Sequence, residues 1–193
     1  MNIAELLRKS RSFRRFHEEQ PIARQTLIEL VELTRLCPSS SNRQPLKYLV
    51  ACEPDERAKV FPHLQWAGAL RDWPGPAEGE RPTAYIVILG DTRIASTFDI
   101  DLGIVAQSML LAAAERGLGG CMFGSVDRRG ICRDLNIPEH LQVVLVVALS
   151  RPAETVVLEE MKDPTAIDYW RDDADVHHVP KRPLEEILVQ FCK

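Results

Sequence analysis

Residues 99–126 read DIDLGIVAQSMLLAAAERGLGGCMFGSV, and this stretch decides the fold. Its first part, residues 99–116, is apolar on almost every side of a helical projection, with the following residues roughly in register: Ile100, Ile104, Gln107, Leu111 and Ala114. This pattern predicts a central helix that is buried nearly all round. Gly117, Gly119 and Gly120 should end it, and residues 121–126 should form a strand.

Working outward, three further apolar runs predict strands at residues 46–52, 83–90 and 141–150. Helices are predicted at residues 3–9, with Asn2 as the N-terminal cap, and at residues 24–36, 55–61 and 127–135. Helices and strands in this alternation indicate three layers, in which helices cover both faces of a sheet. Since the glycine cluster ends a helix and no strand leads into GxGxxG, a dinucleotide-binding Rossmann fold is disfavoured.

Two stretches lack a regular period. Residues 65–82 hold Trp66, Trp73 and several prolines and glycines, a mixture that suits neither helix nor sheet, and we expect a flap with exposed aromatic side chains. Beyond Pro152 the chain is expected to be polar and irregular as far as residue 183. A tail that carries Tyr169 and Trp170 seldom hangs free, and a second subunit is the surface it is expected to wrap.

The 193 residues suit one domain, 45% of them hydrophobic and 27% charged, and the net charge of −4 argues against a nucleic-acid-binding surface. The five cysteines form no CxxC pair and no zinc-binding spacing: Cys37, Cys52, Cys121, Cys132 and Cys192. Their odd number, the lack of a secretory signal in residues 1–10 and the absence of an apolar run long enough to span a bilayer predict a soluble cytoplasmic protein.

Two segments carry chemistry. Arg11 and Arg14 flank Ser12 and can converge on one small polyanion, although a solvated basic turn gives the same pattern. Residues 37–45 read CPSSSNRQP and offer uncharged donors and acceptors that suit the edge of a flat heteroaromatic ring, although a serine-rich turn is the simpler reading. In the central helix Gly103 and Ala106 are small enough to let a second helix or a flat cofactor approach.

Taken together, these segments resemble the nitroreductase family of flavoenzymes. The family's R-S-x-R-x-F is matched by residues 11–16 and its G-L-G by residues 117–119. Its A-P-S-x-x-N-x-Q-P-W corresponds to residues 37–46, CPSSSNRQPL, and its D-x-G-x-A-x-Q-N to residues 101–108, DLGIVAQS. The match covers nearly the whole chain. The resemblance implies an α+β, three-layer α-β-α nitroreductase-like fold over a single FMN-binding domain, residues 1–193, with an active-site flap at 65–82 and an extension at 152–193 that wraps the partner subunit.

The resemblance also implies residue roles. The FMN phosphate would be held by Arg11, Ser12, Arg14 and Arg182, with Lys181 nearby. The flavin would be reached from the other subunit by Pro38, Ser39, Ser40 and Asn42, with Gln44 as a weaker candidate. Gly124 and Ser125 would lie beside the isoalloxazine and offer a backbone N–H to its N5. No catalytic side chain is expected, because flavin N5 carries the chemistry.

The function that the resemblance implies is NAD(P)H-dependent reduction of nitroaromatics, quinones or a related small acceptor by a ping-pong mechanism, in a homodimer with FMN at the interface. Other flavin reactions of the family, reductive dehalogenation and dehydrogenation among them, and a flavin-binding protein without turnover stay open as alternatives. Three positions depart from the pattern, namely Cys37, Leu46 and Ser108. The adjacent His177 and His178 should point apart on an extended segment, so no metal site is expected.

Overall fold

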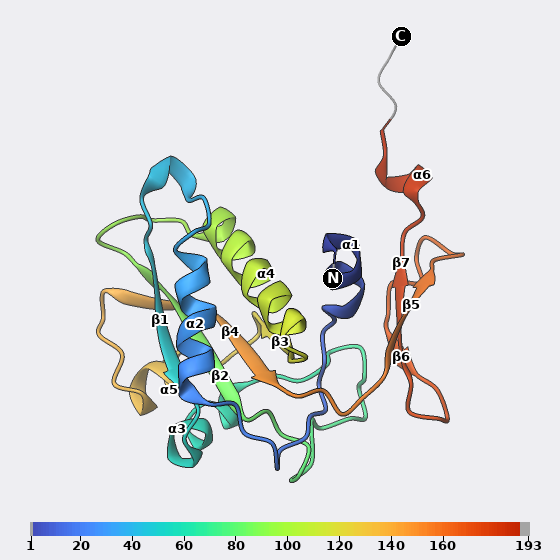
Figure 1. Ribbon diagram of the computed structural model, residues 1–193, viewed down its shortest axis with the longest axis horizontal. Helices are drawn as coiled ribbons and strands as arrows, with labels where there is room; N and C mark the ends of the chain where they lie inside the picture. Colours follow the sequence, from blue (N-terminus) through green and yellow to red (C-terminus); the bar gives the residue numbers. More distant parts are fainter. Residues whose placement is uncertain (1, 190–193) are drawn as a thin grey trace. The chain divides into compact units, whose positions relative to one another are not determined.

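The computed structural model describes residues 2–189, which form two compact units (Figure 1). The first unit consists of residues 2–66 and 75–153, and the second of residues 67–74 and 154–189. The expected flap at residues 65–82 is thus shared between the units. It contains neither helix nor strand, as its composition predicted. The expectation that its aromatic side chains are exposed is wrong, because Trp66 and Trp73 are both half-buried and the Trp66 ring lies edge-on to Phe123, with ring centroids 4.6 Å apart.

The first unit is built on a four-stranded antiparallel sheet in the order β1-β2-β4-β3. These strands are β1 (Leu46–Ala51), β2 (Ala84–Asp91), β3 (Gly119–Phe123) and β4 (Leu141–Ser150). All four strands predicted from apolar runs are confirmed, with ends shifted by at most three residues, and β3 lies at one edge of the sheet. No other strand of this sheet pairs with the outer edge of β3, which is left to an isolated bridge between Gly120 and Ser12.

Both faces of this sheet are covered, as the alternation of helices and strands predicted. Every residue of β2 is buried. One of its faces packs Ile86 and Ile88 against α2 (Arg24–Thr34) and α4 (Asp99–Glu115). The opposite face packs Tyr85 and Val87 against residues around α3 (Pro54–Ala58), η2 (Phe61–His63) and α5 (Arg128–Asp134). The three-layer α+β architecture is therefore confirmed (Figure 1).

The C-terminal end of α4 lies where the glycine cluster predicted it. Gly117 adopts a left-handed φ of 72°. Its N–H bonds Ala114 O at 3.2 Å, and the Leu118 N–H bonds Ala113 O at 2.9 Å. This pair of bonds satisfies the last carbonyls of the helix, and a residue without Cβ adopts the required conformation at least cost.

The prediction that α4 is buried nearly all round is wrong for the single chain. The face against the sheet is buried, with Val105, Met109 and Ala113 at its centre. Ile100 and Ile104, which were among the residues expected to lie on the buried side, are on the other side of the helix. Ile100 is 68% exposed and Ile104 is only half-buried. An almost uniformly apolar helix gives no periodic signal that distinguishes the sheet-facing side from the opposite one.

The N-terminal helices agree with their signals. α1 (Ile3–Lys9) begins with a capping box in which Asn2 accepts from the Glu5 N–H and the Glu5 carboxylate accepts from the Asn2 N–H. α2 ends two residues before the predicted boundary, because the chain tightens from Arg35 onward into i to i−3 hydrogen bonds ahead of Pro38. α5 begins at the Asp127 cap, as expected.

The prediction that residues 153–183 are irregular is also wrong. They contain β5 (Val156–Glu160), β6 (Trp170–Arg171) and β7 (His177–Lys181), a three-stranded sheet in the order β5-β7-β6, followed by α6 (Leu184–Ile187). β5 and β7 pair in parallel across 21 positions of sequence, Val156 opposite His177. The strands are short and show no alternation of polar and apolar residues, so the sequence alone did not predict them.

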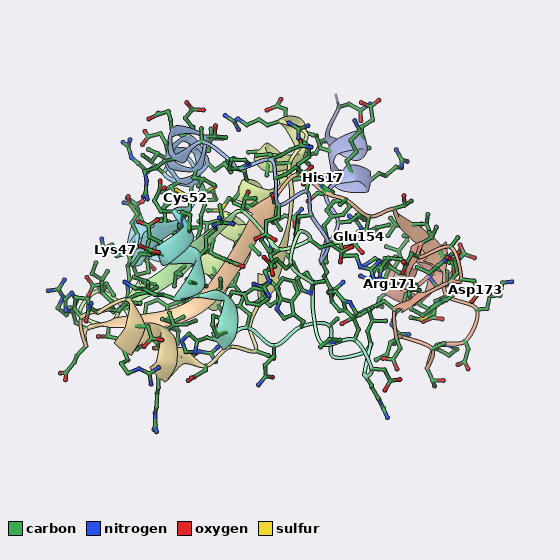
Figure 2. All side chains as sticks on the ribbon, turned by 90° about the horizontal axis from the view of Figure 1, so that it is seen from below. His17, Lys47, Cys52, Glu154, Arg171 and Asp173 are labelled. Atoms are coloured by element: carbon green, nitrogen blue, oxygen red, sulfur yellow. The ribbon has the colours of Figure 1, made fainter. Side chains whose placement is uncertain are left out.

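The second unit has few apolar contacts and several charged ones. Glu154 Oε2 accepts from Arg171 Nη2 at 2.9 Å, with side chains that are 2% and 10% exposed, and Figure 2 shows the two side chains directed at each other. His178 bonds Asp172 Oδ2 through Nε2 at 3.1 Å and Glu159 Oε1 through Nδ1 at 2.5 Å. His177 instead packs against Tyr169, so the two adjacent histidines do point apart.

No helix within residues 2–189 is both long and apolar enough to cross a membrane. Over the same residues no group of three potential ligands forms a metal site. Cys37, Cys52, Cys121 and Cys132 are free thiols, and Cys192 lies outside the described residues.

Candidate functional site

Residues 11–16 run along the open edge of β3. Ser12 forms a parallel bridge with Gly120, and the Phe13 N–H donates to Gly120 O at 3.0 Å. The neighbouring Gly119 permits this approach, because a Cβ there would lie 2.4 Å from the Phe13 ring. The chain then continues beside the end of β4, where Ala153 N donates to Arg15 O at 3.0 Å. Backbone pairing thus fixes the Arg-Ser-x-Arg segment on a rigid support.

The two arginines of this segment are partly withdrawn from water. Arg14 is 8% exposed, and its Nη1 donates to Ser12 O at 3.2 Å. Arg11 donates through Nη2 to Leu7 O at the end of α1, while its Nε is buried and has no acceptor within residues 2–189. Burial lowers the pKa of Arg11. A cation that has lost hydration and keeps an unused donor fits an anionic ligand, such as a phosphate group.

Gly124 and Ser125 follow the other end of β3. Gly124 is exposed, and a Cβ on it would meet nothing within 4 Å, so a flat group could lie against the backbone there. The Gly124 carbonyl accepts from Arg128 Nη2 at 2.9 Å and the Ser125 carbonyl from the Gln65 N–H at 3.1 Å, which fixes this turn. At about 3.4 Å per residue, Gly124 lies roughly 14 Å along the strand from Gly120.

The polar loop at residues 38–44 has a conformation that its side chains hold in place. Ser41, Asn42 and Gln44 all have positive φ values, between 51° and 53°. Ser39 Oγ accepts from the Gln44 N–H at 2.9 Å, and Gln44 Nε2 donates to Asn42 Oδ1 at 3.1 Å. Three left-handed residues outside glycine are costly, so the loop is held in one arrangement by these contacts.

Asp101 anchors this loop to α4, a role the sequence did not reveal. Its carboxylate is 5% exposed and accepts from the Ser40 N–H at 2.7 Å. Asp101 is also one wall of a cavity of about 260 Å³ that is lined by Pro38, Ser39, Gln44 and Tyr48, among others. Asp101 belongs to the D-x-G motif that the sequence analysis identified. Its hydrogen bond with Ser40 could not be predicted, because the two residues are 61 positions apart in the sequence.

Apart from Gly124 and Ser125, the predicted site residues of the first unit fall into two groups at opposite ends of α4. Ser40 bonds Asp101 in the first turn of the helix, whereas Ser12 lies beside Gly120, just past its last turn. A helix of 17 residues is about 25 Å long. Figure 1 shows the residue 38–44 loop and α1 beside different ends of α4. The chain therefore brings Arg11, Ser12 and Arg14 near the β3 edge and keeps the serine-rich loop away from them.

Lys181 and Arg182 belong to the second unit. Lys181 ends β7, is exposed, and accepts through its carbonyl from the Met161 N–H at 2.8 Å. Arg182 bonds Glu186 Oε2 through Nη1 at 2.7 Å and Pro164 O through Nη2 at 3.1 Å. In this arrangement the Arg182 guanidinium is engaged within its own unit.

The three departures from the family pattern are accommodated locally. Ser108 Oγ donates to Ile104 O at 2.7 Å, so its hydroxyl is satisfied by the helix itself. Cys37 and Leu46 are half-buried and pack against the cluster between α2, α4 and the sheet.

Comparison with known proteins gives consistent relatives. A family model described as the nitroreductase family matches residues 7–149. A Methanothermobacter thermautotrophicus protein named for NADH dehydrogenase or NAD(P)H nitroreductase activity is 27% identical over 173 residues, covering 86% of each chain. An iodotyrosine deiodinase of Thermotoga neapolitana is 25% identical over 204 residues, covering 97% of this chain and 96% of the relative. The solved structure of an FMN-dependent nitroreductase from Clostridium difficile R20291 is similar with a TM-score of 0.66, at 19% identity over 99% of both chains.

Proposed function

The chain belongs to the nitroreductase family, and from this premise we propose that it is an FMN-dependent oxidoreductase that uses NAD(P)H to reduce a small electron acceptor. The observation that carries the proposal is the placement of Arg11, Ser12 and Arg14 beside the start of β3, the strand that Gly124 follows directly. A cationic group at one end and bare backbone at the other, roughly 14 Å apart, suit an elongated ligand with one anionic end and one flat end.

In this proposal Arg11, Ser12 and Arg14 hold the FMN phosphate, and the Gly124–Ser125 turn faces the isoalloxazine. The buried Arg11 Nε gains an acceptor when a phosphate oxygen reaches it. The Ser125 N–H, which donates to no acceptor within residues 2–189, is placed to meet a flavin nitrogen. When bound, FMN supplies the two-electron chemistry that accepts hydride from NAD(P)H and passes it to an oxidant. The protein's own residues bind and orient the cofactor.

We also propose that the protein acts as a homodimer that shares its flavin sites. The loop at residues 38–44 and the Arg-Ser-x-Arg segment are separated by the length of α4, about 25 Å, which exceeds the length of one FMN molecule. Both groups can therefore contact one flavin only if the loop comes from a second chain. In that arrangement Pro38, Ser39, Ser40 and Asn42 would reach the flavin of the partner, with Gln44 holding the loop in shape.

Exposed apolar side chains support the dimer. On α2 and α4, Ile28 is 48% and Ile100 68% exposed. At the end of the described chain a run of large apolar residues is more than half exposed: Leu184, Ile187, Leu188 and Val189. Exposed apolar patches of this kind mark surfaces that another chain covers. We propose that residues 152–189 of the predicted extension embrace the partner, while its last four positions lie outside the described residues. Lys181 and Arg182 would then be brought toward a flavin phosphate, and Arg182 would bond the phosphate in place of Glu186.

Reductive dehalogenation is the second candidate, favoured by the similarity to the iodotyrosine deiodinase of Thermotoga neapolitana. The residues assigned above hold the cofactor in either case, so they do not separate the two reactions. A flavin protein without turnover would share the same cofactor site as well.

One experiment tests the proposal. The purified protein is reconstituted with FMN and titrated anaerobically with NADH and with NADPH, while flavin absorbance is followed. We expect bleaching with at least one nucleotide and recovery when a nitroaromatic, a quinone or an iodinated phenol is added. Recovery with the iodinated phenol alone would select dehalogenation. Failure of both nucleotides to bleach bound flavin would overturn the NAD(P)H-dependent activity.

A further inference from the structure

A cavity of about 350 Å³ lies on the first unit between the α3–η2 segment and the start of β2. Its wall includes Glu18, Arg57, Phe61, Arg81, Pro82 and Tyr85, all outside the flavin site proposed above. We propose that this cavity binds a small organic carboxylate with an apolar body. The inference does not rest on the flavin chemistry.

The two arginines of this cavity have almost no partners. Arg57 Nη1 lies 3.7 Å from Glu18 Oε1, too far for a hydrogen bond. Neither the Arg57 nor the Arg81 guanidinium donates to any acceptor within residues 2–189, and both Nε atoms are buried. By comparison, Arg24 makes two bonds of 2.7 and 2.8 Å to the Glu56 carboxylate. Two half-buried guanidiniums with five donors each therefore line one cavity, and neither donates a hydrogen bond to an acceptor within residues 2–189.

The positive charge of Arg81 is held in place. The Arg81 guanidinium lies 4.6 Å from the centroid of the Phe61 ring. Such a contact uses the face of the guanidinium and leaves the N–H groups, which lie in its plane, free for a ligand. Glu18 Oε2 accepts from the Gly79 N–H at 2.7 Å and the Arg81 N–H at 3.2 Å, which fixes the backbone that carries Arg81. The donors of Arg81 are thus preorganised, which lowers the entropy cost of binding.

Tyr85 adds a neutral donor at the floor of the cavity. The residue is 1% exposed, and its ring belongs to the core beneath α3. Burial raises the pKa of its hydroxyl, and the charges nearest to it are those of Arg57, Glu18 and Arg81. The hydroxyl therefore stays protonated and can donate to an anion, and it has no other acceptor within residues 2–189.

The chemistry of the wall selects the class of ligand. Two arginines and one glutamate give a net charge of +1, which balances a carboxylate better than a phosphate dianion. A planar carboxylate matches the fork of a guanidinium. Phe61, Pro54 and Pro82 provide apolar surface for the body of the ligand. An aromatic or short aliphatic acid satisfies all three features.

The test measures benzoate binding to the full-length, FMN-loaded protein by calorimetry at constant ionic strength, with inorganic phosphate as the competing class. We expect saturable binding at one site per chain. Arg57→Gln and Arg81→Gln should each weaken it about tenfold to a hundredfold, because each removes a charge-assisted pair. Arg129→Gln, an exposed arginine on α5 and outside the cavity, is the matched control and should bind as the wild type does.

Several results would overturn the proposal: no saturable benzoate binding, unchanged affinity in both cavity variants, or a change in flavin absorbance that titrates with benzoate. Tighter binding of phosphate than of benzoate would overturn the carboxylate assignment. If the arginine variants do not fold, Tyr85→Phe decides, since it keeps the ring and removes only the donor. It should weaken benzoate about twofold to tenfold, and unchanged affinity there would contradict the cavity geometry.

Discussion

Each of the two units of this chain is stabilised internally by a different kind of interaction. The first has a sheet with both faces buried, and its central strand exposes none of its eight residues to water. The second has a short sheet whose buried contacts include the Glu154–Arg171 ion pair and the imidazole of His177. Its apolar residues Leu158 and Trp170 are 43% and 46% exposed. Hydrophobic burial stabilises the first unit, and charged hydrogen bonds stabilise the second.

This difference has consequences for how each unit responds to change. Apolar burial is non-directional and insensitive to pH, whereas a buried ion pair depends on both partners being present and charged. We therefore expect the second unit to be sensitive to single charge substitutions and to pH, and the first to be sensitive to the loss of volume in its core.

Removal of a charge from the second unit should have the largest effect. Glu154→Ala leaves Arg171 buried without this carboxylate, and breaking such a pair by removing one partner costs about 3–5 kcal/mol. Hydrogen exchange should show loss of protection in β5 and β7, with the first sheet less affected. Asp173→Ala, an exposed acidic residue of the same unit (Figure 2), is the control and should change little. Equal loss of protection in both units would contradict the claim that the second unit is more sensitive to the loss of a charge.

A substitution that creates a cavity in the core of the first unit should destabilise the protein by a comparable or smaller amount. Met109 is fully buried on α4, and Met109→Ala should lower the free energy of unfolding by about 2–5 kcal/mol. Urea denaturation measures it, with the exposed Glu115→Ala on the same helix as the control. A loss that varies strongly between pH 5 and pH 9 would show that charges, and not volume, stabilise this core.

The smallest effect expected is the pH dependence of the second unit. Hydrogen bonds to Asp172 and to Glu159 raise the pKa of His178 above its ordinary value of 6.5. The stability that this group contributes is therefore fully present below pH 6.5 and is lost as the pH rises through its folded pKa. Hydrogen exchange in β7 should accelerate over this range beyond the intrinsic rate. His178→Gln should make hydrogen exchange in β7 less dependent on pH. An unchanged pH dependence in this variant would contradict a role for His178.

The same contrast explains what could be predicted from the sequence. β2 and β4 are long apolar runs, and α4 ends at a glycine with positive φ, so their positions follow from local patterns. The strands of the second unit could not be predicted, because β6 has two residues and β5 pairs with β7 across a long stretch of irregular chain. Which side of α4 meets the sheet was also hidden, since neither side is polar.

The candidate site was predictable in its parts and not in its assembly. The Arg-Ser-x-Arg motif and the serine-rich loop could be recognised in the sequence as polar segments. Their separation along α4 depends on tertiary contacts such as Ser12 beside Gly120 and Ser40 on Asp101. These contacts join residues 108 and 61 positions apart, distances over which spacing in a motif carries no geometric information.

The central claim is that Arg14 and its neighbours hold an FMN phosphate at the edge of β3. It is tested most directly by titrating FMN into the apoprotein and comparing the wild type with Arg14→Lys, which keeps the charge and loses the planar fork. The control is the exposed Arg129→Gln, and thermal unfolding of each apoprotein checks the fold. Because a charge-assisted bond contributes about 1.5–3 kcal/mol, we predict tenfold to a hundredfold weaker FMN binding in Arg14→Lys alone. Equal FMN affinity in all three proteins would contradict the account.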